Sequence, residues 1–490
     1  MKKNLFNWSL LILSILFVAC SSDDNSTPVE PDPEPEEPAE VGITSFGFYA
    51  EDNPEVLFND YIVESIEESM TIDLPEQTAL TALVARYTTT ENDVVTVSST
   101  TQESGVTPND FSGSVEFLVS EGDTNKIYTV TVGKLASAVW SRLGVFGDDL
   151  VYDISMAIDP TSSTPYVSYI SDREDSDSRR LNLVGFSGDA WSRVGAQDFN
   201  AERPRSIELK YNSDGTPFIS YQADFDDLRQ IAITSYDNDW SLVGNGPYTG
   251  IKSAINTLAV DADNTVYGFF TSDERDENRR GLLVKTFSNG SWTDLPIPGR
   301  TGAAIVVTAK AVGNDVYLAV MNFGDLQSVS VYKYSNGSWS TIADQMKESP
   351  ENTISYRHLA MDVDQNGNVY LAYAENTGEG TDVQLKVKAF SAENGTWSTL
   401  GDLIPTPEVR DFDVAVDNYG TAMLFYKNET ETPVFLPFDN EVNNWGAPVV
   451  FETAEADELN LEIAPNGVAY AAYVVADQLY LHKFDSPDND

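Results

Sequence analysis

The chain has 490 residues, of which 41% are hydrophobic and 22% are charged, with 23 Tyr, 23 Phe and 8 Trp. This composition supports a packed core and excludes a chain that is disordered throughout. A formal net charge of −49, from 29 Lys and Arg against 78 Asp and Glu, excludes nucleic acid as a partner. The single Cys excludes structural disulfides, and two His are too few for a zinc site of Cys and His. We therefore expect neither a metal nor a cofactor.

Residues 1–19 have the pattern of a secretory signal that is too short to span a bilayer comfortably. Two lysines precede an apolar run over 8–18, and Ala19 stands directly before Cys20. The segment 16–20 (LFVAC) resembles a bacterial lipobox, which implies that Cys20 is acylated and begins the mature protein. The next residues, SSDD, resemble the acidic signal of Bacteroidota-type lipoproteins. This resemblance implies a lipid anchor in the outer membrane and exposure on the extracellular side.

A tether follows over residues 20–40. Within it, residues 28–40 (PVEPDPEPEEPAE) alternate proline with acid. Such a segment is extended and repels itself, so it reaches on the order of 40 Å at ~3.1 Å per residue. The folded part is therefore expected to stand off the membrane surface.

Residues 41–134 carry short β-type runs broken by clusters of Asn, Asp, Pro and Gly. This spacing predicts an antiparallel β-sandwich. The segments QESG (102–105), PNDF (108–111) and YTVTV (128–132) resemble the immunoglobulin-like spacer domains of Bacteroidota surface lipoproteins. The resemblance implies a spacer or docking module without an active site.

The seven Trp residues that follow the signal segment recur about every 50 residues, which indicates a repeat architecture. They are Trp140, Trp191, Trp240, Trp292, Trp339, Trp397 and Trp445. Each follows a β-type run and a tight turn such as SNGSW, and before each run stands another hairpin, for example LKYNSDGTPFISY. Every unit thus supplies four antiparallel strands. The fixed place of the Trp in each unit favours a core position over a ligand platform.

Seven such units predict an all-β, seven-bladed β-propeller over 135–485, followed by a disordered tail at 486–490. The first Trp-bearing strand, near 139–143, precedes any inner strand, while the last unit lacks a Trp strand. The N-terminal strand is therefore expected to complete the last blade and close the ring, which leaves no strand edge unpaired. The units resemble the Trp and Asp-Gly-x-x-Tyr propellers of Bacteroidota lipoproteins.

Strand direction places the loops between blades and the loops between second and third strands on one face. Twelve of the 15 Arg fall in those loops: Arg173, Arg179, Arg180, Arg203, Arg205, Arg229, Arg275, Arg279, Arg280, Arg300, Arg357 and Arg410. Such a face is suited to carboxylate, sulfate or phosphate groups, which guanidinium forks bind in a bidentate manner, or to an acidic protein surface. The alternative is a set of solvated salt bridges, because acids are equally frequent in the same loops. Nearby aromatic residues, Tyr152 among them, are suited to stacking on sugars or to packing within the loops.

A catalytic role has one candidate constellation. His358 follows Tyr356 and Arg357 at the start of an inner strand and is the only general base expected near this face. Polysaccharide lyases and glycosidases with a propeller fold use His, Tyr and Arg in this way. A structural His at a strand start is the simpler interpretation.

We therefore expect a non-enzymatic surface lipoprotein whose propeller is a binding scaffold. Its expected partner is an outer-membrane barrel, in nutrient uptake, barrel assembly or secretion, or another surface lipoprotein. One alternative is direct binding of an acidic glycan on the Arg face. The other is a lyase or glycosidase that acts on an acidic polysaccharide.

Overall fold

The computed structural model describes residues 41–54, 56–90, 93–147, 150–171, 179–275, 279–297, 303–323, 327–350, 352–376, 383–405 and 411–486, without the side chains of residues 355–357 and 405. Residues 1–40, and with them the signal, Cys20 and the tether, lie outside the described residues, as do 487–490. Within the described ranges the protein is all-β, as predicted, with one 3-10 turn, η1 (Ala50–Asp52). None of its described segments is a helix long and apolar enough to cross a membrane.

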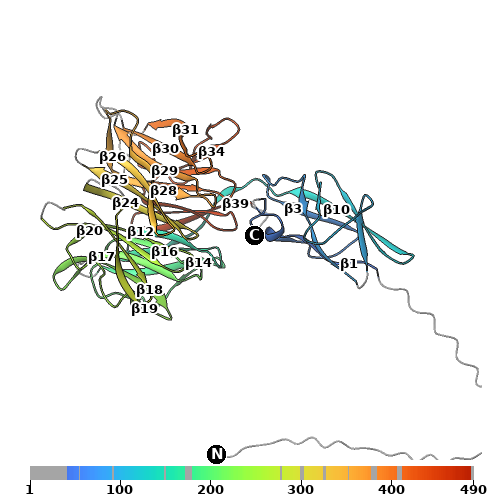
Figure 1. Cartoon of the computed structure of the whole chain (residues 1–490), viewed down its shortest axis with the longest axis horizontal. Coiled ribbons are helices and arrows are strands. Elements are labelled where there is room, and N and C mark those ends of the chain that lie inside the picture. The colour runs from blue at the N-terminus through green and yellow to red at the C-terminus, as the bar shows by residue number, and fades with distance from the viewer. Residues whose placement is uncertain are drawn as a thin grey trace, which may run out of the picture.

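The N-terminal part, over residues 41–134, consists of three sheets (Figure 1). The first, in the order β2-β1-β5, contains β1 (Ile43–Phe48), β2 (Tyr61–Ile62) and β5 (Arg86–Thr89). The second, in the order β3-β10-β9-β6-β7, contains β3 (Ser69–Leu74), β6 (Val94–Val97), β7 (Thr100–Thr101), β9 (Val115–Glu121) and β10 (Thr124–Lys134). The third pairs β4 (Leu83–Val84) with β8 (Pro108–Asn109).

The sequence predicts an antiparallel sandwich, but one pair of strands in this part is parallel. β3 and β10 run parallel, with Thr129 opposite Ser69 and Lys134 opposite Leu74. A parallel pair requires a long connection. The roughly 50 residues between the two strands supply that connection, because they form the rest of the part before the chain returns along β10.

The core of the N-terminal part is aromatic. Phe46, Phe48, Phe111 and Phe117 are almost fully buried and make edge-to-face contacts with ring centroids 4.9–5.8 Å apart. Such pairs contribute about 0.5–1.5 kcal/mol each beyond the area they bury. The alternating burial of β3 and β9 directs every second side chain into this core.

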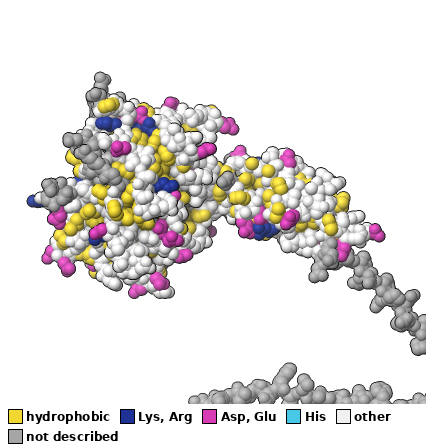
Figure 2. All heavy atoms as spheres, in the orientation of Figure 1, with side chains coloured by type: hydrophobic (Ala, Val, Ile, Leu, Met, Phe, Trp, Pro, Cys, Tyr) yellow, Lys and Arg dark blue, Asp and Glu magenta, His cyan; other side chains and the backbone are white. Residues whose placement is uncertain are grey.

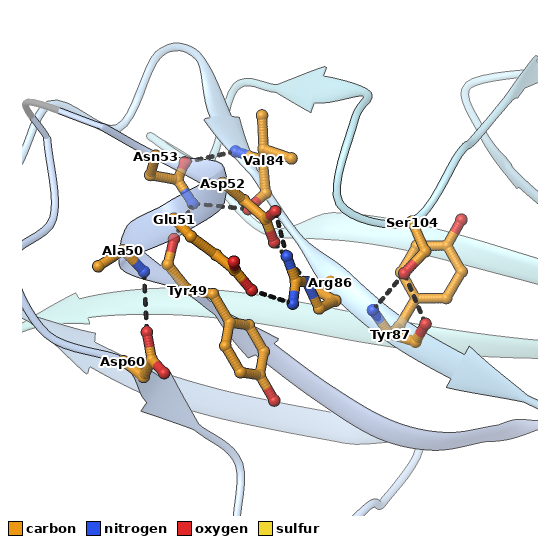
Figure 3. A network of polar contacts seen from close by, with 10 residues as sticks. All are labelled: Tyr49, Ala50, Glu51, Asp52, Asn53, Asp60, Val84, Arg86, Tyr87 and Ser104. Carbon is orange, nitrogen blue, oxygen red and sulfur yellow. Dashed lines mark hydrogen bonds and ion pairs between the residues drawn. The ribbon is translucent and has the colours of Figure 1, made fainter.

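A polar network closes the end of this core around η1 (Figure 3). The guanidinium of Arg86 donates from Nε to Asp52 Oδ2 at 2.6 Å and from Nη2 to Asp52 Oδ1, which makes a bidentate pair. Asn53 bridges the turn to β4, since its Oδ1 accepts from Val84 N at 2.8 Å and its Nδ2 donates to Val84 O at 2.9 Å. Arg86 therefore has a structural role in the N-terminal part, unlike the arginines that lie in the loops of the ring.

The described residues form seven further sheets. The first six have their strands in sequence order, the sixth with a short fifth strand, and the seventh includes a strand from earlier in the chain. The first five contain β12 (Val151–Asp159), β13 (Thr164–Ser171), β14 (Arg180–Ser187) and β15 (Ala190–Arg193); β16 (Arg205–Tyr211), β17 (Pro217–Phe225), β18 (Leu228–Asp237) and β19 (Asp239–Leu242); β20 (Ser253–Val260), β21 (Val266–Ser272), β22 (Leu282–Ser288) and β23 (Ser291–Leu295); β24 (Ala303–Val312), β25 (Asp315–Phe323), β26 (Ser328–Ser335) and β27 (Ser338–Met346); β28 (Thr353–Val363), β29 (Val369–Asn376), β30 (Val383–Ser391) and β31 (Thr396–Pro405).

The sixth sheet contains β32 (Phe412–Val416), β33 (Ala422–Lys427), β34 (Pro433–Asp439), β35 (Asn444–Trp445) and β36 (Val449–Val450). The seventh joins β37 (Asp457–Ile463), β38 (Ala469–Val475) and β39 (Gln478–Asp485) to β11 (Val139–Phe146), which comes before the first sheet in sequence. β11 pairs antiparallel with β39, with Trp140 opposite Phe484. The N-terminal strand therefore completes the last sheet, as the sequence predicted.

The seven sheets form a closed, propeller-like ring (Figure 1). The first strands of successive sheets contact one another all the way round, and β12 of the first sheet contacts β37 of the seventh. Apolar clusters fill the spaces between neighbouring sheets; one, for example, brings together Ala157, Leu183, Leu209 and Tyr221. Each sheet is thus covered on both faces, which explains its almost continuous apolar strands.

The outer strands are fastened to the preceding sheet by Trp. The indole Nε1 of Trp240 donates to Val194 O at 3.1 Å, and that of Trp292 donates to Val243 O at 3.0 Å. Trp339 and Trp397 make the same type of bond to Pro296 and Ile342. These contacts give the repeated Trp a structural role between sheets.

The N-terminal part rests against the ring at the turns of the sixth and seventh sheets. The ring of Phe58 lies 5.0 Å from that of Tyr419 in an edge-to-face contact, and Tyr419 Oη donates to Val56 O at 3.3 Å. Figure 1 shows the two parts joined end to end. The contact leaves the opposite face of the ring uncovered by the N-terminal part.

Candidate functional site

The ring has two faces of different character. One carries the tight turns between first and second strands, and we call it the turn face; it includes residues 212–216, 364–368 and 417–421. The other carries the starts of first strands, the ends of second strands and the starts of third strands, and we call it the rim face. The register shows this grouping, because Arg205 of β16 is paired with Gln222 of β17, and Asp224 of β17 with Arg229 of β18.

A channel runs along the first strands in the middle of the ring. Its rim-face half is a cavity of about 690 Å³ and its turn-face half a cavity of about 720 Å³. Lys310 and Asp362 line both halves. On the turn face, Phe58 of the N-terminal part lies at the wall of the cavity. Among the described residues, none of the N-terminal part lines the rim-face half of the channel.

Side chains of the first strands cap the free edge of the next sheet. Asp153 Oδ2 accepts from Ser206 N at 3.1 Å, Asp411 Oδ2 from Leu459 N at 3.0 Å and Asp413 Oδ2 from Leu461 N at 2.8 Å. Asn460 Oδ1 accepts from Met156 N at 2.9 Å, which joins the seventh sheet to the first. An exposed edge has unpaired N–H groups, so these acceptors explain why polar residues stand in strands that are otherwise apolar.

The channel contains several carboxyl groups whose pKa is raised, chiefly by burial. Burial raises the pKa of Asp153 to about 6 and that of Asp413 to about 8. Burial, with Asp153 and Asp411 nearby, raises the pKa of Glu458 to about 8. Burial opposes the charge of Lys310, but Asp362, to which its Nζ donates, raises its pKa above the ordinary value. The rim-face half therefore contains carboxyl groups that are partly protonated at neutral pH.

An aromatic side chain stands at the mouth of the channel on the rim face. Tyr152 is 45% exposed and lines the cavity. The guanidinium carbon of Arg179 lies 4.2 Å from the centroid of its ring, within cation–π distance. Asp153, Ser206 and Asn460 line the same mouth. An aromatic ring beside hydroxyl, amide and carboxyl groups matches the chemistry of a sugar, which has an apolar face and a rim of hydroxyls.

His358 also lines the rim-face cavity. Its ring lies 4.8 Å from that of Phe412 in an edge-to-face contact. Burial lowers its pKa while Asp411 opposes that change. Tyr356 and Arg357 lie in β28, but their side chains are outside the described residues, so the structure does not show the predicted trio as a unit.

The predicted arginines fall into separate groups. Arg173, Arg300 and Arg410 lie outside the described residues. Arg180 donates from Nη1 to Arg179 O at 2.7 Å, and Arg275 is exposed. Five others gather around two carboxylates, Asp224 and Asp273, in neighbouring sheets: Arg203, Arg205, Arg229, Arg279 and Arg280.

The group around Asp224 contains three arginines. Arg205 Nη2 lies 2.9 Å from Asp224 Oδ2, and Arg229 Nε lies 4.0 Å from Asp224 Oδ1. Together with Arg203, they lower the pKa of Asp224, with the hydrogen bond from Arg205 as the largest cause. We call this group, Arg203, Arg205 and Arg229, the β16–β18 cation group.

The group around Asp273 contains a lysine and two arginines. Lys252 Nζ lies 3.3 Å from Asp273 Oδ2, while Arg279 Nε and Arg280 Nη2 lie 3.6 and 3.9 Å from Asp273 Oδ1. We call this group, Lys252, Arg279 and Arg280, the β20–β22 cation group. The acids of these loops thus pair with the arginines, as the salt-bridge alternative expected, but each central carboxylate is shared by three cations.

Sequence analysis missed the channel carboxylates and Lys252. Acids are so frequent in this chain that their number alone distinguishes none of them. A signal was nevertheless present, because Asp411 and Asp413, like Glu458, Asn460 and Glu462, alternate with apolar residues in a first strand. The alternation places them on the channel side once the strand is recognised as innermost.

Sequence comparison finds a family for the N-terminal part only. Residues 55–132 match the family model described as "SGBP, N-terminal", whose members are surface glycan-binding proteins of Bacteroidota type. The match covers the segment that the sequence analysis compared with spacer domains of Bacteroidota lipoproteins, and it implies a cell-surface protein. No curated protein matches the chain.

Structural comparison finds propeller-like neighbours of low identity. The chain is similar to AofleA from Arthrobotrys oligospora, at 10% identity and a TM-score of 0.41 over 65% of this chain and 90% of that one. It is similar to a PL25 ulvan lyase, at 14% identity and 0.44 over 70% and 95%, and to a DUF4623 family protein from Bacteroides eggerthii, at 11% identity and 0.35 over 91% and 98%. Because all three TM-scores are below 0.5, these likenesses assign no activity to this chain.

Proposed function

We propose that this protein binds a polysaccharide at the cell surface through the rim face of its ring. The observation that carries the proposal is the channel mouth, where half-exposed Tyr152 stands among hydrogen-bonding groups in a cavity of about 690 Å³. The surface glycan-binding family model of residues 55–132 supports the same function from the other end of the molecule. Glycan binding was the alternative in the sequence analysis and replaces the scaffold role as the preferred function.

The proposal includes the finer architecture that the sequence predicts. The seven sheets are the blades of a seven-bladed β-propeller, and the sheets of residues 41–134 form an immunoglobulin-like module. Cys20 is lipidated, and the acidic tether holds the protein on the outer face of the outer membrane. The contact between Phe58 and Tyr419 supports a fixed placement of the ring on this module, with the rim face free.

Retention on immobilised polysaccharides tests the proposal. The full chain in mild detergent is passed over neutral polymers (dextran, xylan) and acidic ones (polygalacturonate, dextran sulfate). We expect retention on at least one polymer, and we expect Tyr152→Ala to weaken it about tenfold, because truncation of an aromatic residue that anchors a binding site costs more than about 1 kcal/mol. Tyr236→Ala, at the turn-face end of the third strand β18, is the control. Equal retention of the two variants, or no retention of the wild type, would contradict the proposal.

Catalysis at the same mouth is a second candidate function. His358 and Asp411 line one cavity with Glu458 and Asp153. Burial raises the pKa of Glu458 to about 8 and that of Asp153 to about 6. Pairs of titratable groups with separated pKa values suit general acid–base work. Incubation of the retained polysaccharide with the protein, followed by measurement of new chain ends, tests this function. His358→Ala should abolish turnover and leave retention unchanged.

A role beside an outer-membrane barrel stays a prediction of the sequence analysis. A glycan-binding lipoprotein that hands polysaccharide to a barrel would unite it with the proposed function. Extraction of the tagged chain in mild detergent, with identification of proteins recovered in near-stoichiometric amounts, tests that prediction. Recovery of the chain alone would count against it.

A further inference from the structure

We infer that the two cation groups form a tandem site for consecutive anionic groups of one polysaccharide. The inference rests on the proposed function and specifies its substrate class as a polymer that bears carboxylate or sulfate at regular intervals. It follows from three observations: a cation and an Asp at equivalent positions of neighbouring sheets, guanidinium donors without an acceptor among the described residues, and other pairs of residues at the same sequence positions of the remaining sheets.

The two groups occupy equivalent positions. Glu208 of β16 is paired with Ser220 of β17, and Thr257 of β20 with Phe269 of β21. Counted from these pairs, Arg203 and Lys252 both lie five residues before the first-strand member. Asp224 and Asp273 both lie four residues after the second-strand member. The neighbouring sheets thus present a cation, Arg in one and Lys in the other, and an Asp at the same positions, related by the rotation from one sheet to the next.

The same positions are different elsewhere in the ring. In the other five sheets, the corresponding pairs of residues are Leu150 and Asp172, Ala303 and Phe323, Ser355 and Asn376, Glu408 and Glu429, and Glu455 and Ala476. None of these pairs combines a cation with an Asp. The architecture of a sheet therefore does not require the combination, which sets these two sheets apart from the general repeat.

The cations have more hydrogen-bond donors than the central carboxylates accept. Arg205 Nη1 and Arg229 Nε are shielded from solvent and have no hydrogen-bond partner in the part of the chain that the structure describes. In the other group, Arg279 and Arg280 lie 3.6 and 3.9 Å from Asp273 Oδ1, and this oxygen accepts no hydrogen bond from the described residues, so neither guanidinium is fully engaged by the central carboxylate. A buried donor without an acceptor costs free energy. An added anion with several oxygens would satisfy such donors, and guanidinium forks match carboxylate and sulfate in geometry.

Neighbouring acids limit the affinity of each group. Glu274 Oε1 accepts from Lys252 N at 2.9 Å, and Asp226 and Asp227 lie in the exposed turn beside Arg229. A single anion would therefore bind weakly to either group. A polymer that places one anion at each group gains effective concentration for the second contact. The site is consequently expected to select polymers over monomers and to weaken with salt, since its charges are partly exposed.

Binding of defined polymers to the full chain tests the inference. Polygalacturonate supplies carboxylate, dextran sulfate supplies sulfate, and uncharged dextran is the neutral probe. Arg229→Ala and Arg279→Ala remove one exposed arginine from each group, at side-chain exposures of 41% and 56%, so the fold should tolerate both. We expect each to weaken binding of an acidic polymer about tenfold, and the double variant to bind it no better than galacturonate or sulfate monomers. Thermal melting verifies that each variant is folded.

Arg275→Ala is the matched control, because Arg275 is an exposed arginine of the same face outside both groups. It should change the affinity less than twofold. Loss of affinity equal to that of Arg279→Ala would overturn the inference in favour of nonspecific attraction. Wild-type binding to dextran or xylan alone, lost in Tyr152→Ala and unchanged in the arginine variants, would overturn the inference and leave the proposed function standing. Absence of binding to every polymer would contradict both.

Discussion

At the scale of single residues, charges inside this protein are held by particular partners. Lys386 and Glu375 form an ion pair with side-chain exposures of 1% and 0%. Glu375 Oε1 also accepts from Glu348 N at 2.8 Å. Removal of one partner from a buried pair leaves an uncompensated charge. The pair is therefore sensitive to single substitutions and tolerant of matched ones.

Lys386→Met should lower the free energy of unfolding by about 3–5 kcal/mol. Lys386→Met combined with Glu375→Gln should recover most of that loss, because the amide is neutral and keeps an oxygen to accept the Glu348 N–H. Lys388→Met, which removes a cation beside the more exposed Glu348, should cost less than about 1 kcal/mol. Urea unfolding measures all three. A double variant as unstable as the single one would show that the charge of Glu375 is not the cause.

The carboxyl of Asp413 makes stability depend on pH. Its pKa is raised from 3.8 to about 8 by burial, so the folded protein binds this proton more tightly than the unfolded chain. Stability from this group is present at low pH and is lost as pH rises from about 4 to about 8. Asp413→Asn, which imitates the protonated carboxyl, should flatten the fall in unfolding free energy between pH 5 and pH 8 by about 1–3 kcal/mol. An unchanged slope in urea titrations at both pH values would refute the assignment.

At the scale of strands and sheets, the repeated Trp fastens each outer strand to the sheet before it. Trp292 Nε1 donates to Val243 O, and its ring stacks on Tyr248 with centroids 4.5 Å apart. Trp191 packs on Phe186 in the same position of the first sheet, but its Nε1 has no hydrogen-bond partner. A comparison of Trp292 with Trp191 therefore distinguishes the contribution of the indole hydrogen bond from that of ring packing.

Trp292→Phe should destabilise the protein by about 1 kcal/mol more than Trp191→Phe, because only the former loses an indole hydrogen bond. Both variants lose comparable ring area. The difference between their urea midpoints, at constant m-value, measures the bond. Equal losses would show that the indole N–H contributes nothing measurable to the contact between sheets.

The elements of this fold were largely predictable, because strand period and turn residues are local signals. Asn-Gly turns and the Trp period fix the hairpins and the outer strands, and the unpaired first and last units indicate closure through β11. The parallel pairing of β3 with β10 was not predictable, since it depends on which distant strand lies alongside. The spacing of the strands also predicts that the arginines lie in loops of the rim face. Their grouping around Asp224 and Asp273 could not be predicted, because it depends on how three strands are aligned in space.

At the scale of the whole molecule, the ring is joined to the N-terminal part by its turn face only. Phe58 and Tyr419 meet there, and Phe58 lines the turn-face half of the channel. Acidic side chains are spread over both parts, whereas Lys and Arg are few (Figure 2). In a molecule of net charge −49, a face that concentrates arginine is suited to an anionic ligand.

The arrangement separates three tasks along the molecule. Residues 20–40 are expected to tether, residues 41–134 to hold the ring at a fixed angle, and the rim face to bind. The sequence predicts the binding residues only in part. The channel carboxylates and Tyr152 are far apart in the sequence and come close in space only because the ring closes. Asn460 and Met156 illustrate this, since residues at opposite ends of the ring segment meet in one hydrogen bond.

Hydrogen exchange of the full chain, with and without a saturating polysaccharide that it retains, tests the central claim most directly. We predict slower exchange on the rim face, in residues 150–154, 203–206, 224–229 and 279–280, with no change in the turns at 212–216 and 364–368. The mouth of the channel and both cation groups would then form one footprint. Protection confined to the turn face or to residues 41–134, with the rim face unchanged, would contradict the account.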